Sequence, residues 1–159
     1  MKKNQKKQSG FTLIELLIVI TIIAIIVAVI FVILNPMELF AKSRNSQRWV
    51  KVSELLTAIH IYSTQHDGNL PNESSWVEGN NYVLGTGSGC NTSCSATTTV
   101  FSCLDLTDLV NDKRISQIPM DPKTGTVANT DVWVTRASGT IVTVGMCDPE
   151  LGEVINLTR

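Results

Sequence analysis

The chain has 159 residues and a mass of 17.4 kDa, enough for one ordinary domain with an appendage but too few for an enzyme with separate cofactor and substrate lobes. Thirteen basic and fourteen acidic residues leave a net charge of −1, which does not indicate nucleic acid as the main partner. The basic charge is concentrated at the start of the chain, where four lysines lie within ten residues: Lys2, Lys3, Lys6 and Lys7. The apolar residues are equally concentrated, because Leu16 to Leu34 carries no charge, so an ordinary soluble protein is not expected.

The apolar segment from Phe11 to Leu34 predicts a membrane-spanning helix. A helix needs roughly 20 mostly apolar residues to cross about 30 Å of hydrocarbon, whereas a core helix is usually shorter and has a polar stripe. The lysines before the segment favour a cytoplasmic N-terminus and an exported remainder. A cleaved secretory signal is disfavoured, because the segment is too long and Leu39 stands where a cut after Ala41 needs a small residue.

One acidic residue, Glu15, interrupts the apolar pattern at its cytoplasmic edge. A carboxylate at the centre of a membrane helix costs about 2.5–3.5 kcal/mol on insertion scales, and less near the interface. Two interpretations remain open for Glu15. Its side chain reaches the lipid headgroups, or it pairs with a charge inside an assembly of such helices.

The residues from Gly10 to Ile20, GFTLIELLIVI, resemble the N-terminal signature of type IV pilins and of the pseudopilins of type II secretion. The resemblance implies that a prepilin peptidase removes the basic leader, residues 1–10, by cutting between Gly10 and Phe11. It also implies that Phe11 is then N-methylated, and that Glu15 pairs with the N-terminal amine of a neighbouring subunit. Because an unpaired charge is costly in a low-dielectric bundle, such a pair would set the axial offset between helices. The resemblance is close over residues 1–62 and architectural beyond.

After the membrane segment, residues 35–66 are predicted to continue the helix and to pack on a head. Asn35-Pro36 is expected to kink or open it, because proline lacks an N–H and clashes with the preceding turn. Apolar side chains then recur at helical spacing: Trp49, Val52, Leu55, Leu56, Ile59 and Tyr62. Charged residues are expected largely off this stripe: Lys42, Arg44, Arg48, Lys51 and Glu54. Gly68 is a plausible stop.

The remaining residues, 67–159, are predicted to form an exported globular head. Polar loops are followed by a short helix within Leu104 to Ile115, where apolar residues recur at helical spacing. Alternation over residues 132–136, a turn, and residues 141–144 predict a hairpin, and Glu153 to Leu157 is a candidate third strand. The predicted fold class is α+β, with a long N-terminal helix on a small antiparallel sheet. The pilin resemblance implies the same architecture.

Four cysteines lie beyond the membrane segment: Cys90, Cys94, Cys103 and Cys147. On the exported side two disulfides are expected, and four cysteines allow three pairings. Short loop closure suggests Cys90 with Cys94 and Cys103 with Cys147. Zinc is disfavoured, because the spacing does not resemble paired zinc knuckles.

No catalytic motif, cofactor or metal site is predicted, and the chain is not expected to be an enzyme. His60 and His66 lack the spacing of metal ligands and are interpreted as surface residues. Calcium remains an alternative, since some secretion pseudopilins bind it near the C-terminal sheet, but the available oxygen donors match no calcium motif: Asp121, Asp131, Asp148 and Glu150.

The sequence thus predicts a structural subunit of a type IV pilus-like filament. Before assembly it is expected to span the inner membrane once, with the head exported, and afterwards to lie in a surface pilus. The alternatives are a periplasmic pseudopilin of type II secretion and an uncleaved, signal-anchored protein with a binding head. The resemblance implies four kinds of partner: further pilin copies, a prepilin peptidase, a platform protein and an assembly ATPase. Direct nucleic-acid binding is not expected, because residues 67–159 carry five basic and eleven acidic residues.

Overall fold

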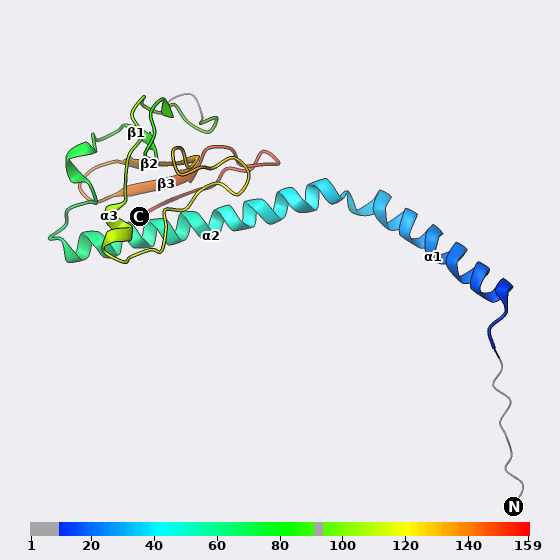
Figure 1. The fold of residues 1–159 in the computed structure, drawn as a ribbon. Helices are drawn as coiled ribbons and strands as arrows, with labels where there is room; N and C mark the ends of the chain where they lie inside the picture. The colour runs from blue at the N-terminus through cyan, green and yellow to red at the C-terminus, as the bar shows by residue number, and fades with distance from the viewer. Residues whose placement is uncertain (1–9, 91–93) are drawn as a thin grey trace, which may run out of the picture. The chain divides into compact units, whose positions relative to one another are not determined.

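The computed structural model describes residues 10–90 and 94–159, so the predicted leader, except Gly10, lies outside the described residues. Contacts divide the chain into two compact units, Met1–Leu39 and Phe40–Arg159. The elements follow the α+β class predicted from the sequence, with two consecutive helices followed by a small antiparallel sheet (Figure 1).

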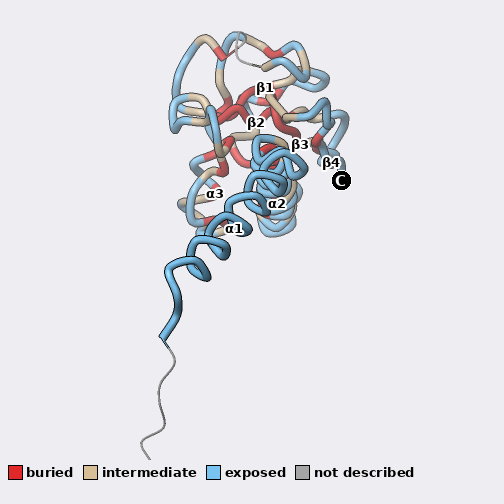
Figure 2. The backbone as a smooth tube through the Cα atoms, turned by 90° about the vertical axis from the view of Figure 1, so that its right-hand side faces the viewer, coloured by how far each residue is buried: buried red, intermediate tan, exposed pale blue. Residues whose placement is uncertain are grey.

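The main element of the first unit is helix α1, Leu13–Leu34. Isoleucine and valine dominate it, and in water these β-branched residues are only moderate helix formers. In a bilayer, however, a spanning segment must satisfy its backbone groups internally, which favours a helix. No residue of α1 is buried, as Figure 2 shows along its length. The helix is long and apolar enough to cross a membrane.

A single residue, Asn35, separates α1 from helix α2, Pro36–Gln65. Asn35 has a left-handed backbone conformation, with φ of 38°, which ends α1. Pro36 then takes the first position of α2, where its missing N–H breaks no helical hydrogen bond. The predicted interruption at Asn35-Pro36 is confirmed.

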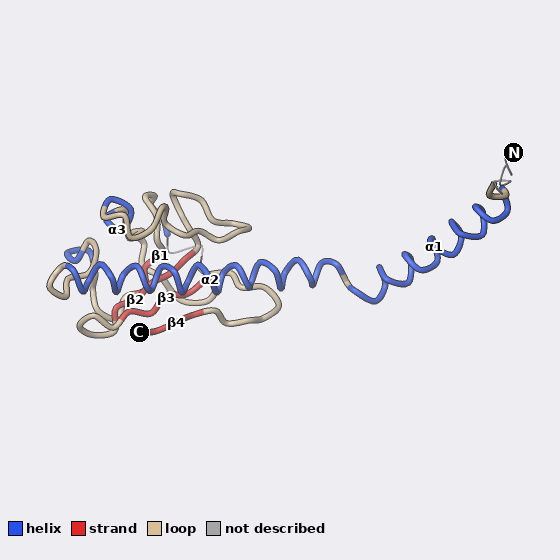
Figure 3. The backbone as a smooth tube through the Cα atoms, turned by 90° about the horizontal axis from the view of Figure 1, so that it is seen from below, coloured by secondary structure: helices blue, strands red, loops and turns tan. Residues whose placement is uncertain are grey.

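Helix α2 packs one face on the sheet of the second unit, along which it runs in Figures 1 and 3. Its buried residues follow helical spacing: Ala41, Asn45, Arg48, Val52, Leu55, Leu56, Ala58, Ile59 and Ser63. The helix ends at Gln65, and the N–H of Gly68, at φ +88°, closes the turn on the carbonyl of Ser63 at 2.9 Å. The predicted stop at Gly68 is thus confirmed to within one turn.

The sheet has four antiparallel strands in the order β1-β2-β3-β4. Their bounds are β1 Asn81–Val83, β2 Val132–Arg136, β3 Val142–Met146 and β4 Asn156–Thr158. The predicted hairpin corresponds to β2 and β3, with Val134 opposite Val144. The third predicted strand overlaps β4 but begins later, because Glu150 to Glu153 forms a turn closed by an N–H···O bond of 3.3 Å.

The two faces of the sheet are covered by different parts of the chain. Side chains alternate across a strand, so Val132 and Val134 join the core against α2, while Trp133 points to the other face. There Trp133 packs with Val83 and the cysteines. The four-stranded sheet is therefore covered by a helix on one side and by a disulfide-linked loop on the other.

The short helix predicted in the head is shorter in the structure. Helix α3 spans only Asp108–Asn111, within the predicted range Leu104 to Ile115, and a 3₁₀ turn lies at Glu73–Ser75. Leu104 is instead held in a parallel bridge with Leu84, which keeps it extended. Helical spacing in this range reflects burial of a mostly irregular segment, since Leu106 and Leu109 are in the core.

Candidate functional site

The predicted cleavage junction lies just before α1, in a segment without helical structure. Gly10, Phe11 and Thr12 precede the first helical residue, and Gly10 and Phe11 are exposed. A Cβ placed on Gly10 would meet no atom within 4 Å. The structure therefore places the Gly10–Phe11 bond in accessible, non-helical backbone, as a peptide bond must be to enter a protease.

The start of α1 is set by a reciprocal hydrogen-bonded cap between Thr12 and Glu15. The Thr12 hydroxyl accepts the Glu15 N–H at 3.2 Å, and the Glu15 carboxylate accepts the Thr12 N–H at 2.9 Å and the Thr12 hydroxyl at 2.8 Å. Such a capping box satisfies two N–H groups that would otherwise lack partners at a helix end. In a single chain Glu15 is thus a capping residue, and both residues are exposed.

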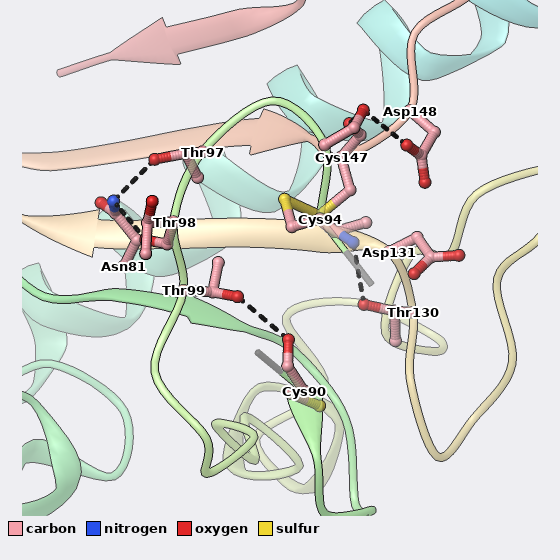
Figure 4. The surroundings of a disulfide bond; sticks show 12 residues. Asn81, Cys90, Cys94, Thr97, Thr98, Thr99, Thr130, Asp131, Cys147 and Asp148 are labelled. Carbon is pink, nitrogen blue, oxygen red and sulfur yellow. Dashed lines mark hydrogen bonds between the residues drawn. A yellow bond between two sulfur atoms is a disulfide. The ribbon is translucent and has the colours of Figure 1, made fainter. Parts of the chain in front are cut away.

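The four cysteines form two disulfides, but with a pairing different from the one expected. Cys90 is bonded to Cys103 and Cys94 to Cys147, so the pairing inferred from short loop closure is wrong. A local antiparallel bridge between Ser88 and Ser102 brings the first pair together. The second pair, Cys94 and Cys147, joins this loop to the end of β3 (Figure 4). The N–H of Ala96 also bonds to the Cys147 carbonyl at 3.0 Å.

Two of the four carboxylates considered as calcium donors, Asp121 and Glu150, are paired with arginines of the chain itself. Arg48 donates from Nε to Asp121 Oδ2 at 2.6 Å and from Nη2 to Oδ1 at 3.1 Å, with both side chains almost fully buried. Arg44 donates two hydrogen bonds to the Glu150 carboxylate, from Nε to Oε2 at 2.6 Å and from Nη2 to Oε1 at 2.7 Å. Within residues 10–90 and 94–159 no group of three His, Cys, Asp or Glu side chains is arranged to hold a metal ion.

This ion-pair cluster corrects one expectation about α2. Arg48 was expected largely off the apolar stripe, yet it is fully buried between Asn45 and Val52, at the helical spacing of the buried face. Its Nη1 also donates to Asn45 Oδ1 at 2.7 Å and to Glu150 at 3.0 Å. The spacing signal was present in the sequence, but the acidic partner lies 73 residues away and nothing local identifies it.

The cluster shifts the acidity of its carboxyl groups. Burial by itself raises the pKa of Asp121, but hydrogen bonds from Arg48 and from the N–H groups of Lys123 and Thr124 outweigh it and hold that pKa below its usual range. Hydrogen bonds from Arg44 and Arg48 hold the pKa of Glu150 far below its ordinary value. Both carboxylates are therefore ionised throughout the neutral and mildly acidic range.

Asp131 behaves in the opposite way. Burial raises its pKa, and the neighbouring Asp148 and Asp121 add to this effect. This carboxyl group is not held by any arginine in the hydrogen bonds and ion pairs of the described residues. Folding therefore disfavours the ionised form of Asp131, although a hydrogen bond with Thr124 acts in the opposite direction.

The two histidines, which the sequence suggested were surface residues, are both partly buried. The ring of His66 stacks on Tyr62 at 3.8 Å, its Nδ1 faces the Tyr62 carbonyl at 2.9 Å, and its Nε2 lies 3.2 Å from Asp112. These contacts tie the end of α2 to the end of α3. They provide His66 with a structural role in the head.

Comparison with known proteins identifies one similarity. A family model described as the prokaryotic N-terminal methylation motif matches residues 5–31, which include the predicted cleavage junction, the capping box and most of α1. No curated protein and no solved structure matches the chain.

Proposed function

Because the chain carries the prepilin motif common to type IV pilins and pseudopilins, we propose that it is a structural subunit of a type IV pilus-like filament. Proteins with this motif are in general made as membrane-anchored precursors, processed by a prepilin peptidase and assembled into filaments. The proposal goes further in choosing a pilus over a secretion pseudopilus. The filament role itself is supported by an accessible Gly10–Phe11 junction directly before an exposed apolar helix with Glu15 in its first turn. Pilins and pseudopilins share this motif, so the choice between them is made by the experiment below.

Processing begins at the leader, residues 1–10. A cut between Gly10 and Phe11 removes the four lysines and leaves α1 on the mature chain. Cleavage on this side of the helix, unlike secretory signal cleavage, preserves the membrane anchor for later assembly. Phe11 then carries the new N-terminal amine, which is the group to be methylated.

Assembly uses residues 11–34. In lipid these apolar side chains gain little by associating, since lipid tails are as apolar as they are, so specific contacts must favour the filament. Glu15 supplies such a contact, because it can exchange its Thr12 cap for the N-terminal amine of another copy. The exchange keeps the carboxylate paired in a low-dielectric bundle.

The rest of the chain forms the exported part, with residues 35–66 as the helix that carries the head and residues 67–159 as the head itself. Two disulfides suit an oxidising compartment outside the cytoplasm. The partners on this proposal are further pilin copies, the peptidase, an inner-membrane platform protein and an assembly ATPase. The role is structural, without catalysis or cofactor.

The deciding experiment is N-terminal sequencing and intact mass of the protein from membranes and from sheared surface filaments. A chain that begins at methylated Phe11 in the sheared fraction supports the pilus. The same chain confined to membranes indicates the pseudopilin, and a chain that still begins at Met1 overturns processing. Replacing Gly10 with a bulky residue is the matched test, because an uncleaved signal anchor would keep its mass and its function.

The role of Glu15 has its own test. The variant Glu15→Ala is expected to be exported and to melt like the unmodified chain, since Glu15 is exposed and its side chain is hydrogen-bonded to Thr12, but to yield at least tenfold less filament. Lower stability of the head in this variant would contradict a role confined to assembly.

A further inference from the structure

One tryptophan in the head has no acceptor for its indole N–H. Trp133 is 9% exposed, and its Nε1 is buried without a hydrogen-bond partner in the part of the chain that the structure describes. The other two tryptophans are satisfied. Trp49 donates to the Glu153 carboxylate at 2.7 Å, and Trp76 donates to the Pro71 carbonyl at 2.8 Å. Because a buried donor without an acceptor is unfavourable, the surroundings of Trp133 favour a ligand that brings one.

The indole reaches across the sheet because the neighbouring strand carries a glycine. Trp133 on β2 is opposite Gly145 on β3, and Gly145 is opposite Asn156 on β4. A Cβ on Gly145 would lie 2.7 Å from Nε1 and 2.5 Å from Cε2, so the edge of the ring that carries the N–H covers this glycine. Residues opposite one another point to the same face of a sheet. The side chain of Asn156 therefore lies on the same face as the indole, one strand further along.

Trp133 and Asn156 line one cavity, with a volume of about 210 Å³. Apolar side chains form part of its wall, among them Met146 and Val154, and Val154 is 72% exposed. None of the described residues that line the cavity is basic, and Glu153 adds a carboxylate, so an anionic ligand is disfavoured. A neutral carboxamide suits both polar groups, because its carbonyl can accept from the indole and its NH₂ can donate to the Asn156 oxygen.

Strand β4, which follows the cavity wall, forms an open edge of the sheet. It is the last strand in the order β1-β2-β3-β4 (Figure 2). Val142 and Arg159 exchange two backbone hydrogen bonds, of 2.9 and 3.1 Å. Because antiparallel strands alternate between residues bonded to the partner and residues that point outward, the N–H and C=O groups of Asn156 and Thr158 point away from β3. No described residue bonds to these outward groups.

The opposite edge of the sheet, at β1, is covered by the chain itself. The N–H of Val100 bonds to the Asn81 carbonyl at 3.0 Å. The N–H of Leu104 bonds to the Val83 carbonyl at 2.9 Å. The three residues of β4 include neither lysine nor proline, which commonly protect an exposed edge. Strand β4 is therefore the edge to which a further strand can be added.

Two acidic residues at the cavity have no cationic partner. Asp148 accepts the Ser95 hydroxyl at 2.6 Å, and Ser95 lines the cavity. The two carboxylate oxygens of Glu153 accept only neutral donors, the Asn45 amide and the Trp49 indole. Neither acidic residue forms an ion pair within residues 10–90 and 94–159. Charge complementarity therefore favours a partner that carries basic residues.

We propose that β4 and this cavity form a docking site for an extended, basic segment of another protein. The segment adds beside β4 as a fifth strand, in which main-chain hydrogen bonds provide affinity and side-chain pockets provide specificity. The indole edge lies over β3, two strand spacings or roughly 10 Å from the backbone of such a strand. Only a long carboxamide side chain reaches Trp133 from there, so glutamine is favoured over asparagine. The site involves only the head and does not depend on the filament role proposed above.

The test is an NMR titration of the full chain in detergent, isotope-labelled at its tryptophan indoles. The probe is the acetylated and amidated peptide Lys-Val-Gln-Val-Thr-Lys. At millimolar peptide the indole N–H signal of Trp133 is expected to shift, while that of Trp76, which is bonded to Pro71, stays in place. The same peptide with leucine in place of glutamine should bind about fivefold more weakly, because it brings no acceptor for the indole.

Two positions of the chain test the two halves of the site, with affinities measured by calorimetry. Trp133→Phe keeps an aromatic ring but removes the N–H, and should weaken binding about fivefold. Thr158→Pro removes the outward N–H of β4 without breaking a bond to β3, and should weaken binding about tenfold. Thr158→Val is its control, because it also loses the hydroxyl contact with Thr143 but keeps the N–H, and should bind like the unmodified chain.

Several results would overturn this assignment. An unmoved Trp133 signal at millimolar peptide, or equal binding of the leucine peptide, would remove the role of the indole. Equal binding by Thr158→Pro and Thr158→Val would exclude strand addition. A Trp133 signal that shifts with the concentration of the chain alone would make the occupant a second copy, and acetamide as effective as the peptide would make the cavity a site for small amides. None of these results bears on the filament role, which N-terminal sequencing decides.

Discussion

Replacement of Arg48 by alanine tests whether the buried ion pair organises the head. The side chains of Arg48 and Asp121 are 1% and 0% exposed, and two hydrogen bonds join them. Truncating one partner of a buried pair leaves an uncompensated charge, which costs about 3–5 kcal/mol. Arg48→Ala also removes the bonds to Asn45 and Glu150, so the upper part of this range is expected.

The assay is thermal and urea unfolding of the full chain in detergent, followed by the circular dichroism of its aromatic residues. For a unit the size of Phe40–Arg159, a loss of about 3–5 kcal/mol lowers Tm by roughly 10–20 °C. The double variant Arg48→Met/Asp121→Leu is the control, because removing both charges together is often close to neutral. A loss below about 1 kcal/mol for Arg48→Ala, or a double variant no more stable than it, would refute the reasoning.

Three further predictions concern the same unit. Cys94→Ser opens a bond between residues 53 apart and should cost about 4 kcal/mol, against about 3 for Cys90→Ser with a separation of 13, measured by urea unfolding; equal losses would argue against loop entropy. Because folding lowers the pKa values of Asp121 and Glu150, their stabilisation is complete above the unfolded values near pH 4 and is lost as the pH falls further. An acid titration of Tm should therefore steepen below that pH, and should steepen less in Arg48→Met/Asp121→Leu, where Arg44 still holds Glu150 but the Asp121 carboxylate is gone. Gly145→Val places a Cβ 2.5 Å from the Trp133 ring and should cost roughly 1–3 kcal/mol, visible as altered tryptophan fluorescence and a lower Tm; an unchanged Tm would contradict this packing.

Several features of the head could be read only in part from local pattern. The hairpin of β2 and β3 was predictable, because alternation and a turn are properties of adjacent residues. Within the predicted range Leu104 to Ile115 the observed helix has only four residues, since a bridge from Leu84 holds Leu104 extended. Apolar spacing by itself does not distinguish a helix from an irregular buried segment.

Part of the candidate site could likewise be predicted from local sequence, and part could not. The junction at Gly10, the cap residue Thr12 and Glu15 form one short motif, so their proximity follows from the chain order. The ion-pair cluster of Arg48, Asp121 and Glu150 had no such signal. Its two carboxylates reach Arg48 only through tertiary packing.

By itself the sequence determined the apolar helix α1, its break at Asn35-Pro36, the amphipathic helix α2 and the α+β class, because periodicity, capping and proline geometry act between near neighbours. Only the tertiary structure decided the pairing of the cysteines and the burial of Arg48. Both depend on contacts between distant residues: Cys94 with Cys147, 53 positions apart, and Arg48 with Asp121, 73 apart. A charged side chain can be buried when an oppositely charged partner is buried beside it, and only the folded chain places the two together.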